Sequence, residues 1–168
     1  MRFVGLIGIA GCLLLGAASV RPSDAADVPE IRIEIPVVLK EARIVFNLDH
    51  LVFDGDEPIG LQFLRIMVPR FKENGTKAEI IAVFHGNAGY MLLDDAKYDR
   101  VRNWHGGNPY KAQIASLIQQ GVQVEECAET MRLKGWGNAD LLPDVKVNSG
   151  ANFRIVQLVQ AGFVQLQP

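Results

Sequence analysis

Cysteine is scarce in this chain of 168 residues, which contains only Cys12 and Cys127. No C-x-x-C pair occurs, and this excludes a dithiol oxidoreductase. A basic excess is also missing, because 17 Lys and Arg residues face 19 Asp and Glu residues for a formal net charge of −2. We therefore expect no binding of nucleic acid, whose phosphates require positive charge.

Motifs of common cofactor sites and catalytic centres are absent as well. The glycine cluster HGNAG, residues 85–89, lacks the lysine and the glycine order of a phosphate loop. No Ser-His-Asp arrangement has a supporting spacing. The chain has few histidines, and no pair of candidate ligands has a helical ligand spacing within a predicted helix; the set considered is His50, His85, His105, Asp49, Asp54 and Asp56. We predict no metal site and no cofactor.

The first 25 residues have the pattern of a secretory signal peptide. Arg2 precedes an apolar run, and Ser23 and Ala25 are the small residues that a signal peptidase prefers. We predict cleavage after Ala25, a periplasmic or secreted product, and no stable membrane anchor. The alternative is lipidation at Cys12 within IAGC, but the apolar run continues past this residue. After cleavage, Cys127 is the only cysteine.

The remaining chain alternates between strand-like and helix-like segments. Residues 26–41 are expected to form an extended lead-in, and residues 42–168 an α/β domain with a mostly parallel sheet and helices on both faces. Strands are predicted at 42–49, 77–86, 122–127, 144–150 and 163–167, helices at 59–74, 108–121, 128–135 and 151–162, and short helices within 87–107.

Local signals in these helices give more specific predictions. Asp56 is expected to cap the first helix, and Pro69 to kink it or end it early. Its buried stripe is predicted at Ile59, Phe63, Met67 and Phe71. Asn108 is expected to cap the helix at 108–121, and the helix at 151–162 to bury Ile155, Val156 and Val159.

Cys127 occupies the point where a predicted strand gives way to a helix. In parallel α/β sheets, ligands gather at the carboxyl ends of the strands, where His85 is also placed. The amino end of the following helix favours a thiolate, as do Arg132 and Lys134, whereas Glu residues nearby disfavour it. Composition and position leave three readings open: a reactive thiol, a buried structural cysteine, and a disulfide-linked dimer.

Several segments, taken in order, resemble one family. They are AVFHGNAGYMLLDD, NPYKAQIASLIQQGVQVEECAETMRLKGW and DLLPDVKVNSGANFRIVQLVQAGF. The chain from about Ala42 to Leu166 is similar to the DsrE/DsrF-like sulfur-relay family, in its exported single-domain branch. Lys134 stands where relatives often have arginine.

The resemblance implies a three-layer α/β/α fold with a five-stranded sheet, and a homo-oligomer, often a trimer or hexamer. It implies a sulfur carrier or sulfurtransferase-like protein in which Cys127 accepts sulfur as a persulfide and exchanges it with a donor or acceptor protein. The matching positions around the cysteine are His85, Gly86, Thr130 and Arg132. The alternative is a non-catalytic periplasmic binding or assembly protein.

Overall fold

The computed structural model describes residues 30–168; the predicted signal peptide at residues 1–25 lies outside this range. Residues 37–168 form one compact unit, and residues 30–36 belong to a separate N-terminal unit. Residues 30–40 contain no helix or strand. None of the helices within the described range is long and apolar enough to cross a membrane.

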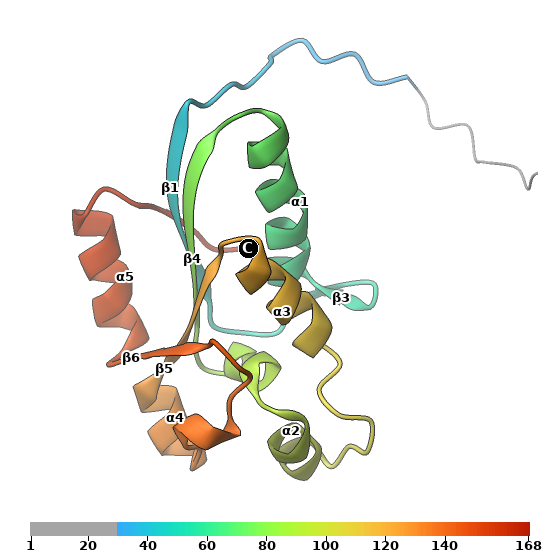
Figure 1. The fold of residues 1–168 in the computed structure, drawn as a ribbon, viewed down its shortest axis with the longest axis vertical. Coiled ribbons are helices and arrows are strands. Elements are labelled where there is room, and N and C mark those ends of the chain that lie inside the picture. Colours follow the sequence, from blue (N-terminus) through green and yellow to red (C-terminus); the bar gives the residue numbers. More distant parts are fainter. Residues whose placement is uncertain (1–29) are drawn as a thin grey trace, which may run out of the picture. The chain divides into compact units, whose positions relative to one another are not determined.

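The unit is built on a five-stranded sheet in the order β6-β5-β4-β1-β7, and all four neighbouring pairs are parallel. The strands are β1 (Glu41–Leu48), β4 (Lys77–Phe84), β5 (Gln123–Cys127), β6 (Lys146–Asn148) and β7 (Val164–Leu166). Helices α1 (Ile59–Glu73) and α3 (Lys111–Gln119) cover one face, and α5 (Ala151–Gln160) covers the other (Figure 1). The predicted three-layer α/β/α class with a five-stranded sheet is confirmed.

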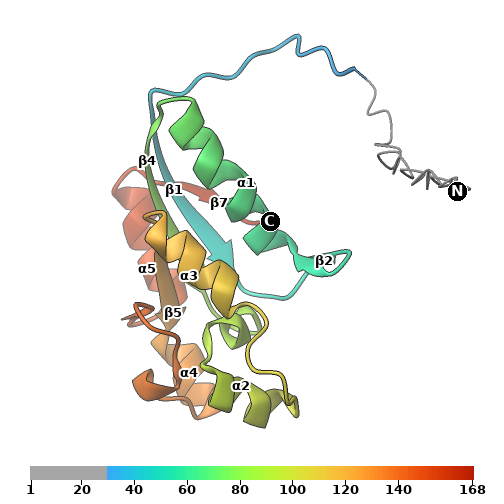
Figure 2. The same cartoon turned by 45° about the vertical axis from the view of Figure 1, so that its right-hand side comes forward.

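Shorter elements complete the chain between these layers. They are β2 (Phe53–Asp54), β3 (Glu57–Pro58), the 3-10 helices η1 (Ala88–Leu92) and η2 (Asn138–Asp140), and the helices α2 (Asp95–Arg102) and α4 (Ala128–Lys134). Figure 2 shows α2 and α4 at the end of the sheet where β5 finishes. This end carries the predicted site.

Each strand sends alternate side chains to the two helical layers. Even-numbered residues such as Phe46, Phe84 and Val124 pack with α1 and α3. Odd-numbered residues such as Val45, Val83 and Cys127 pack with α5. Because side chains alternate along a strand with a period of two, this register alone decides that the cysteine faces α5.

The start of α1 differs from the prediction. Phe53–Asp54 and Glu57–Pro58 pair as a small antiparallel hairpin, with Gly55 at φ +59° in its turn. The residue before the first helical turn is Pro58, without a side-chain cap, so the predicted Asp56 cap is wrong. The two turn residues are Gly55 and Asp56, and a Gly-Asp pair between two strands is a signal for such a hairpin that was present in the sequence.

The predicted early end of α1 is also wrong, because the helix continues through Pro69 to Glu73. A proline inside a helix costs about 3 kcal/mol through a lost hydrogen bond and a clash. Val68 and Phe71 on either side pack against the main core, and this burial offsets the cost.

The buried faces of two helices were assigned partly wrongly. In α1, Leu61 and Leu64 are fully buried, whereas Phe63 is 42% exposed. In α5, Ile155 is buried as predicted, but Val156 and Val159 are exposed, and the core contacts come from Ala151 and Leu158. Apolar residues occur all round both helices, so the period alone could not select the side that meets the sheet.

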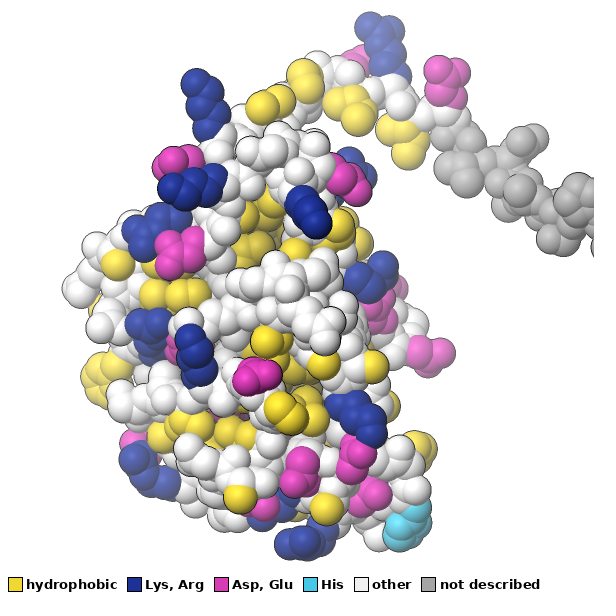
Figure 3. All heavy atoms as spheres, in the orientation of Figure 1, with side chains coloured by type: hydrophobic (Ala, Val, Ile, Leu, Met, Phe, Trp, Pro, Cys, Tyr) yellow, Lys and Arg dark blue, Asp and Glu magenta, His cyan; other side chains and the backbone are white. Residues whose placement is uncertain are grey.

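Charged side chains of both signs are interspersed over the face shown in Figure 3, between small groups of apolar atoms. That face therefore offers no extended area of a single charge.

The buried face of α1 predicts different effects for substitutions of two neighbouring residues, Leu64 and Phe63. Leu64→Ala should lower the free energy of unfolding by about 2–5 kcal/mol, because it leaves a cavity in the core. Phe63→Ala, its neighbour on the outer side, should cost much less. Urea denaturation of both variants measures the difference, and a larger loss from Phe63→Ala would contradict the assigned face.

Candidate functional site

The Cys127 thiol lies between strand β5 and helix α5. Cys127 is the last residue of β5 and pairs in register with Asn148, the last residue of β6. Its Sγ accepts a hydrogen bond of 3.3 Å from the backbone N–H of Ala151, the first residue of α5. The sequence pointed to the helix that follows the cysteine, but the amide that reaches the sulfur belongs to α5.

The thiol borders a small pocket although Cys127 is only 4% exposed. This cavity of about 180 Å³, here called the cysteine pocket, is formed by the end of β4, helix α4 and the start of α5. Its lining residues are His85, Cys127, Glu129, Thr130, Leu133, Gly150, Ala151, Asn152 and Phe153. Leu133 and Phe153 are 88% and 81% exposed, so the pocket has apolar side chains that also face solvent.

His85 lies in this pocket as a half-buried side chain. Its Nε2 is 2.8 Å from Oδ1 of Asn47 on β1. With this carbonyl oxygen as acceptor, Nε2 carries the ring proton and Nδ1 is left as an acceptor. Burial lowers the pKa of His85, and the Asp49 carboxylate offsets part of the shift, so the ring is neutral at pH 7.

Gly86 and Thr130 connect the histidine loop to helix α4. The N–H of Gly86 donates to Thr130 Oγ1 at 2.9 Å. Gly86 has φ +57°, and a Cβ on it would lie 2.6 Å from the backbone oxygen of Asp49, so only glycine fits there. This contact brings together two of the predicted site residues and holds the neighbouring His85 in place.

Lys134 makes a second link between α4 and the same loop. Its Nζ donates to Tyr90 Oη at 3.2 Å and to Asn87 Oδ1 at 3.5 Å. It also lies 4.4 Å from the Tyr90 ring centroid and 5.6 Å from that of Trp136. Lys134 therefore supports the loop as a cation against aromatic rings.

Arg132 is not brought into the cysteine pocket. Its guanidinium forms an ion pair with Glu129, and both side chains are well exposed. Of the predicted residues, His85, Cys127 and Thr130 line the cavity, and Gly86 contacts it through Thr130, whereas Arg132 lies outside.

Glu125 is buried on the same face of β5 as Cys127. Arg154 of α5 binds its carboxylate through Nε and Nη2, at distances of 2.9 to 3.1 Å. Gln123 Nε2 and Asn148 Nδ2 donate to the remaining lone pairs. This ion pair fixes α5 against β5 close to the cysteine.

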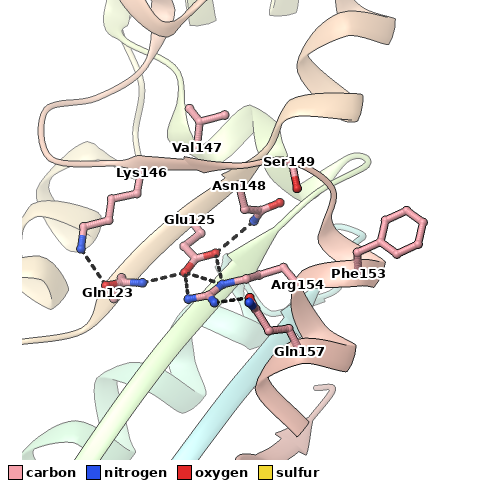
Figure 4. A pocket seen from close by; sticks show the side chains of 9 residues that line it. All are labelled: Gln123, Glu125, Lys146, Val147, Asn148, Ser149, Phe153, Arg154 and Gln157. Atoms are coloured by element: carbon pink, nitrogen blue, oxygen red, sulfur yellow. Dashed lines mark hydrogen bonds and ion pairs between the residues drawn. The ribbon is translucent and has the colours of Figure 1, made fainter. Parts of the chain in front are cut away.

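A larger cavity of about 520 Å³ opens beside this ion pair and is called here the β6 pocket (Figure 4). It is lined by Gln123, Glu125, Lys146, Val147, Asn148, Ser149, Phe153, Arg154 and Gln157. Phe153 borders both the β6 pocket and the cysteine pocket.

Glu126 lies between Glu125 and Cys127 in β5, and its side chain points to the opposite face of the sheet. It is fully buried, and neither carboxylate oxygen has a hydrogen-bond partner in residues 30–168. Burial raises the pKa of Glu126 to about 9, so the side chain is a neutral acid at pH 7. Gly89 makes room for it, since a Cβ there would lie 2.7 Å from Oε1.

Asn108 has a different role from the predicted cap. Helix α3 begins at Lys111, and Asn108 is buried before it. Its Nδ2 donates to the carbonyl oxygens of Met91 and Leu93, and its Oδ1 accepts from the N–H of Tyr110. Asn108 therefore ties η1 to the turn before α3.

Sequence reasoning missed Asn47, Asn148 and Ala151. Asn47 is the last but one residue of β1 and Asn148 is the last residue of β6, and polar side chains at the carboxyl ends of parallel strands were a usable signal. Ala151 acts through its backbone, for which the sequence carries no signal. Across residues 30–168, no three His, Cys, Asp or Glu side chains are grouped so as to hold a metal ion.

No family model and no curated protein sequence matches this chain. Among solved structures, it is similar to MTH1491 from Methanobacterium thermoautotrophicum, a protein of unknown function, with 23% identity and a TM-score of 0.60. It is also similar to the ychN protein from E. coli, with 14% identity and a TM-score of 0.54. Each comparison covers 76% of this chain and 99% of the other. The chain therefore has the DsrE/DsrF-like fold that both structures share.

The raised pKa of Glu126 predicts a pH-dependent stability. The folded state keeps a proton on Glu126 up to about pH 9, whereas the unfolded chain loses it near pH 4.5. The free energy of unfolding is therefore unaffected by this group below pH 4.5 and falls as the pH rises from 4.5 to about 9. Glu126→Gln should remove this slope, which is at most about 1.4 kcal/mol per pH unit. The free energy of unfolding of Glu126→Gln, relative to that of the parent protein, should therefore increase from pH 5.5 to pH 8.5 when both are measured by urea denaturation.

The matched control is Glu129→Gln, an exposed carboxyl three residues away. Its difference from the parent should stay nearly constant across this pH range. A constant difference for Glu126→Gln as well would show that the buried acid does not titrate as stated.

Proposed function

We propose that the protein is an exported sulfur carrier of the DsrE/DsrF-like type, with Cys127 as the residue that accepts and releases sulfane sulfur. The observation that carries the proposal is the Cys127 Sγ, which accepts the N–H of Ala151 at 3.3 Å and borders a pocket shared with His85. Export rests on the N-terminal sequence pattern.

The surroundings of the sulfur can hold negative charge that develops on it when it reacts. The Ala151 amide belongs to the first turn of α5, where N–H groups point outward and the helix dipole favours negative charge. Of the acidic residues near the sulfur, Glu125 is paired with Arg154, Glu129 is paired with Arg132, and Glu126 is a neutral acid on the other face. A neutral His85 has an unprotonated ring nitrogen that can accept the thiol proton.

The reaction needs no cofactor. The thiolate attacks the outer sulfur of a persulfide R–S–SH, an S–S bond to Cys127 forms, the S–S bond of the donor breaks, and R–S⁻ leaves. The reverse exchange with an acceptor thiolate releases the sulfur. A cavity of about 180 Å³ holds little more than the reacting sulfur end of a donor.

Sulfur loading gives the direct test. Incubation with inorganic polysulfide should add the mass of one or more sulfur atoms to the intact chain, and a reductant should remove it. Cys127→Ser should add none. An unchanged mass of the parent protein under these conditions would rule out the carrier function.

The second candidate is a non-catalytic assembly protein with Cys127 as a structural residue. The low exposure of Cys127 and its packing with Val45, Val83 and Ile155 favour this reading. It predicts slow alkylation of the native thiol and fast alkylation after denaturation. The carrier predicts that both rates are similar.

A homo-oligomer, trimer or hexamer, is part of the same proposal. Apolar side chains on the β2–β3 hairpin and α1 are exposed by 39% to 47%, and a second copy would cover them; they are Val52, Phe53, Phe63 and Ile66. Ile66→Glu should reduce the mass measured by light scattering, whereas Val159→Glu on α5 should not. A monomeric parent, or equal effects of the two changes, would refute this interface.

A further inference from the structure

We propose that the β6 pocket binds the body of a short peptide thiol that carries a free carboxylate, and that this molecule is the low-molecular-weight sulfur donor for Cys127. The inference rests on the proposed function and adds the substrate class. The first step in its support is size. The β6 pocket, at about 520 Å³, lies within the usual range of small-molecule sites, whereas the cysteine pocket is below it.

The second step is the position of the β6 pocket relative to the thiol. Asn148, which lines it, is the direct strand partner of Cys127, so their backbones are about 4.8 Å apart and their side chains share a face of the sheet. Phe153 borders both cavities. A ligand in the β6 pocket therefore has to extend only past this ring to reach the cysteine pocket.

The third step is charge. The three charged residues that line the β6 pocket are Glu125, Lys146 and Arg154, which leaves one positive charge in excess. Arg154 is engaged by Glu125, whereas within the described part of the chain the Nζ of Lys146 donates only to the neutral Gln123, at 2.7 Å (Figure 4). Lys146 is thus the cation available for a ligand carboxylate.

The fourth step is an acceptor without a donor. Asn148 Nδ2 donates to Glu125 at 3.1 Å, which fixes the orientation of the amide, and its Oδ1 is enclosed without a partner among residues 30–168. In Figure 4 this oxygen points away from Glu125, toward the side of Ser149 and Phe153. An enclosed acceptor is costly when unpaired, and a peptide N–H of the ligand would satisfy it.

These groups fit a molecule with a carboxylate at Lys146, an N–H at Asn148 and a sulfur that passes Phe153. The transfer step then follows the balance given above: Cys127 gains the outer sulfur with its proton, and the peptide thiolate leaves. No oxidant or reductant is consumed.

Binding is tested without chemistry by using Cys127→Ser protein and S-methylglutathione as a probe in calorimetry. We expect saturable binding at one site per chain. Lys146→Gln should weaken it roughly tenfold through the lost charge-assisted contact, and esterification of the probe carboxylates should have a similar effect. The matched control is Lys77→Gln, an exposed lysine at the opposite end of the strands, which should leave binding unchanged. Absent binding at millimolar probe, or equal binding by the Lys146 and Lys77 variants, overturns the inference.

Sulfur loading separates this inference from the proposed function. Glutathione persulfide should load Cys127 faster in the parent than in Lys146→Gln, whereas inorganic polysulfide should load both at the same rate. Loading by polysulfide without any binding of the glutathione probe would refute the peptide-thiol site and leave the carrier intact. Binding of the probe, with no loading from either donor, would refute the carrier and leave the site as a peptide-thiol site.

Discussion

The ion pair between Glu125 and Arg154 fixes helix α5 against strand β5 beside the cysteine. It joins the strand that ends in Cys127 to the helix whose first amide reaches the sulfur. Two nitrogens of one guanidinium bind one carboxylate, which fixes both distance and orientation. The same pair forms one wall of the β6 pocket, so the environment of the thiol and the shape of the neighbouring cavity depend on a single contact between layers.

Three consecutive buried residues on β5 meet three different environments because of the alternation of the strand. Glu125 is paired with Arg154, Glu126 is a neutral acid among apolar side chains, and the sulfur of Cys127 accepts a backbone N–H. Close spacing in sequence therefore does not give the three residues the same partners. Cys127 still contributes electrostatically to the raised pKa of Glu126, after the larger effect of burial.

The sheet and its layers were predictable from the sequence because they depend on apolar runs separated by turns, and the five strands were placed within a few residues. The site was predictable only in part. His85, Thr130 and Cys127 stand at the ends of elements, where parallel strands bring them together. The Ala151 amide, the partners Asn47 and Asn148, and the exclusion of Arg132 depend on tertiary packing and on rotamers. The buried faces of α1 and α5 were ambiguous because each helix carries apolar residues on more than one side.

The order of β5 and α5 along the chain has a kinetic consequence. Helix α5 begins at Ala151, after the strand that ends in Cys127, so the element that covers the sulfur leaves the ribosome later than the sulfur itself. Until it docks, a chain with β5 already formed presents a bare thiol to any oxidant in its surroundings. The yield of folded protein with a free thiol thus depends on the relative rates of helix docking and thiol oxidation. A reducing agent during refolding slows the oxidation and raises this yield.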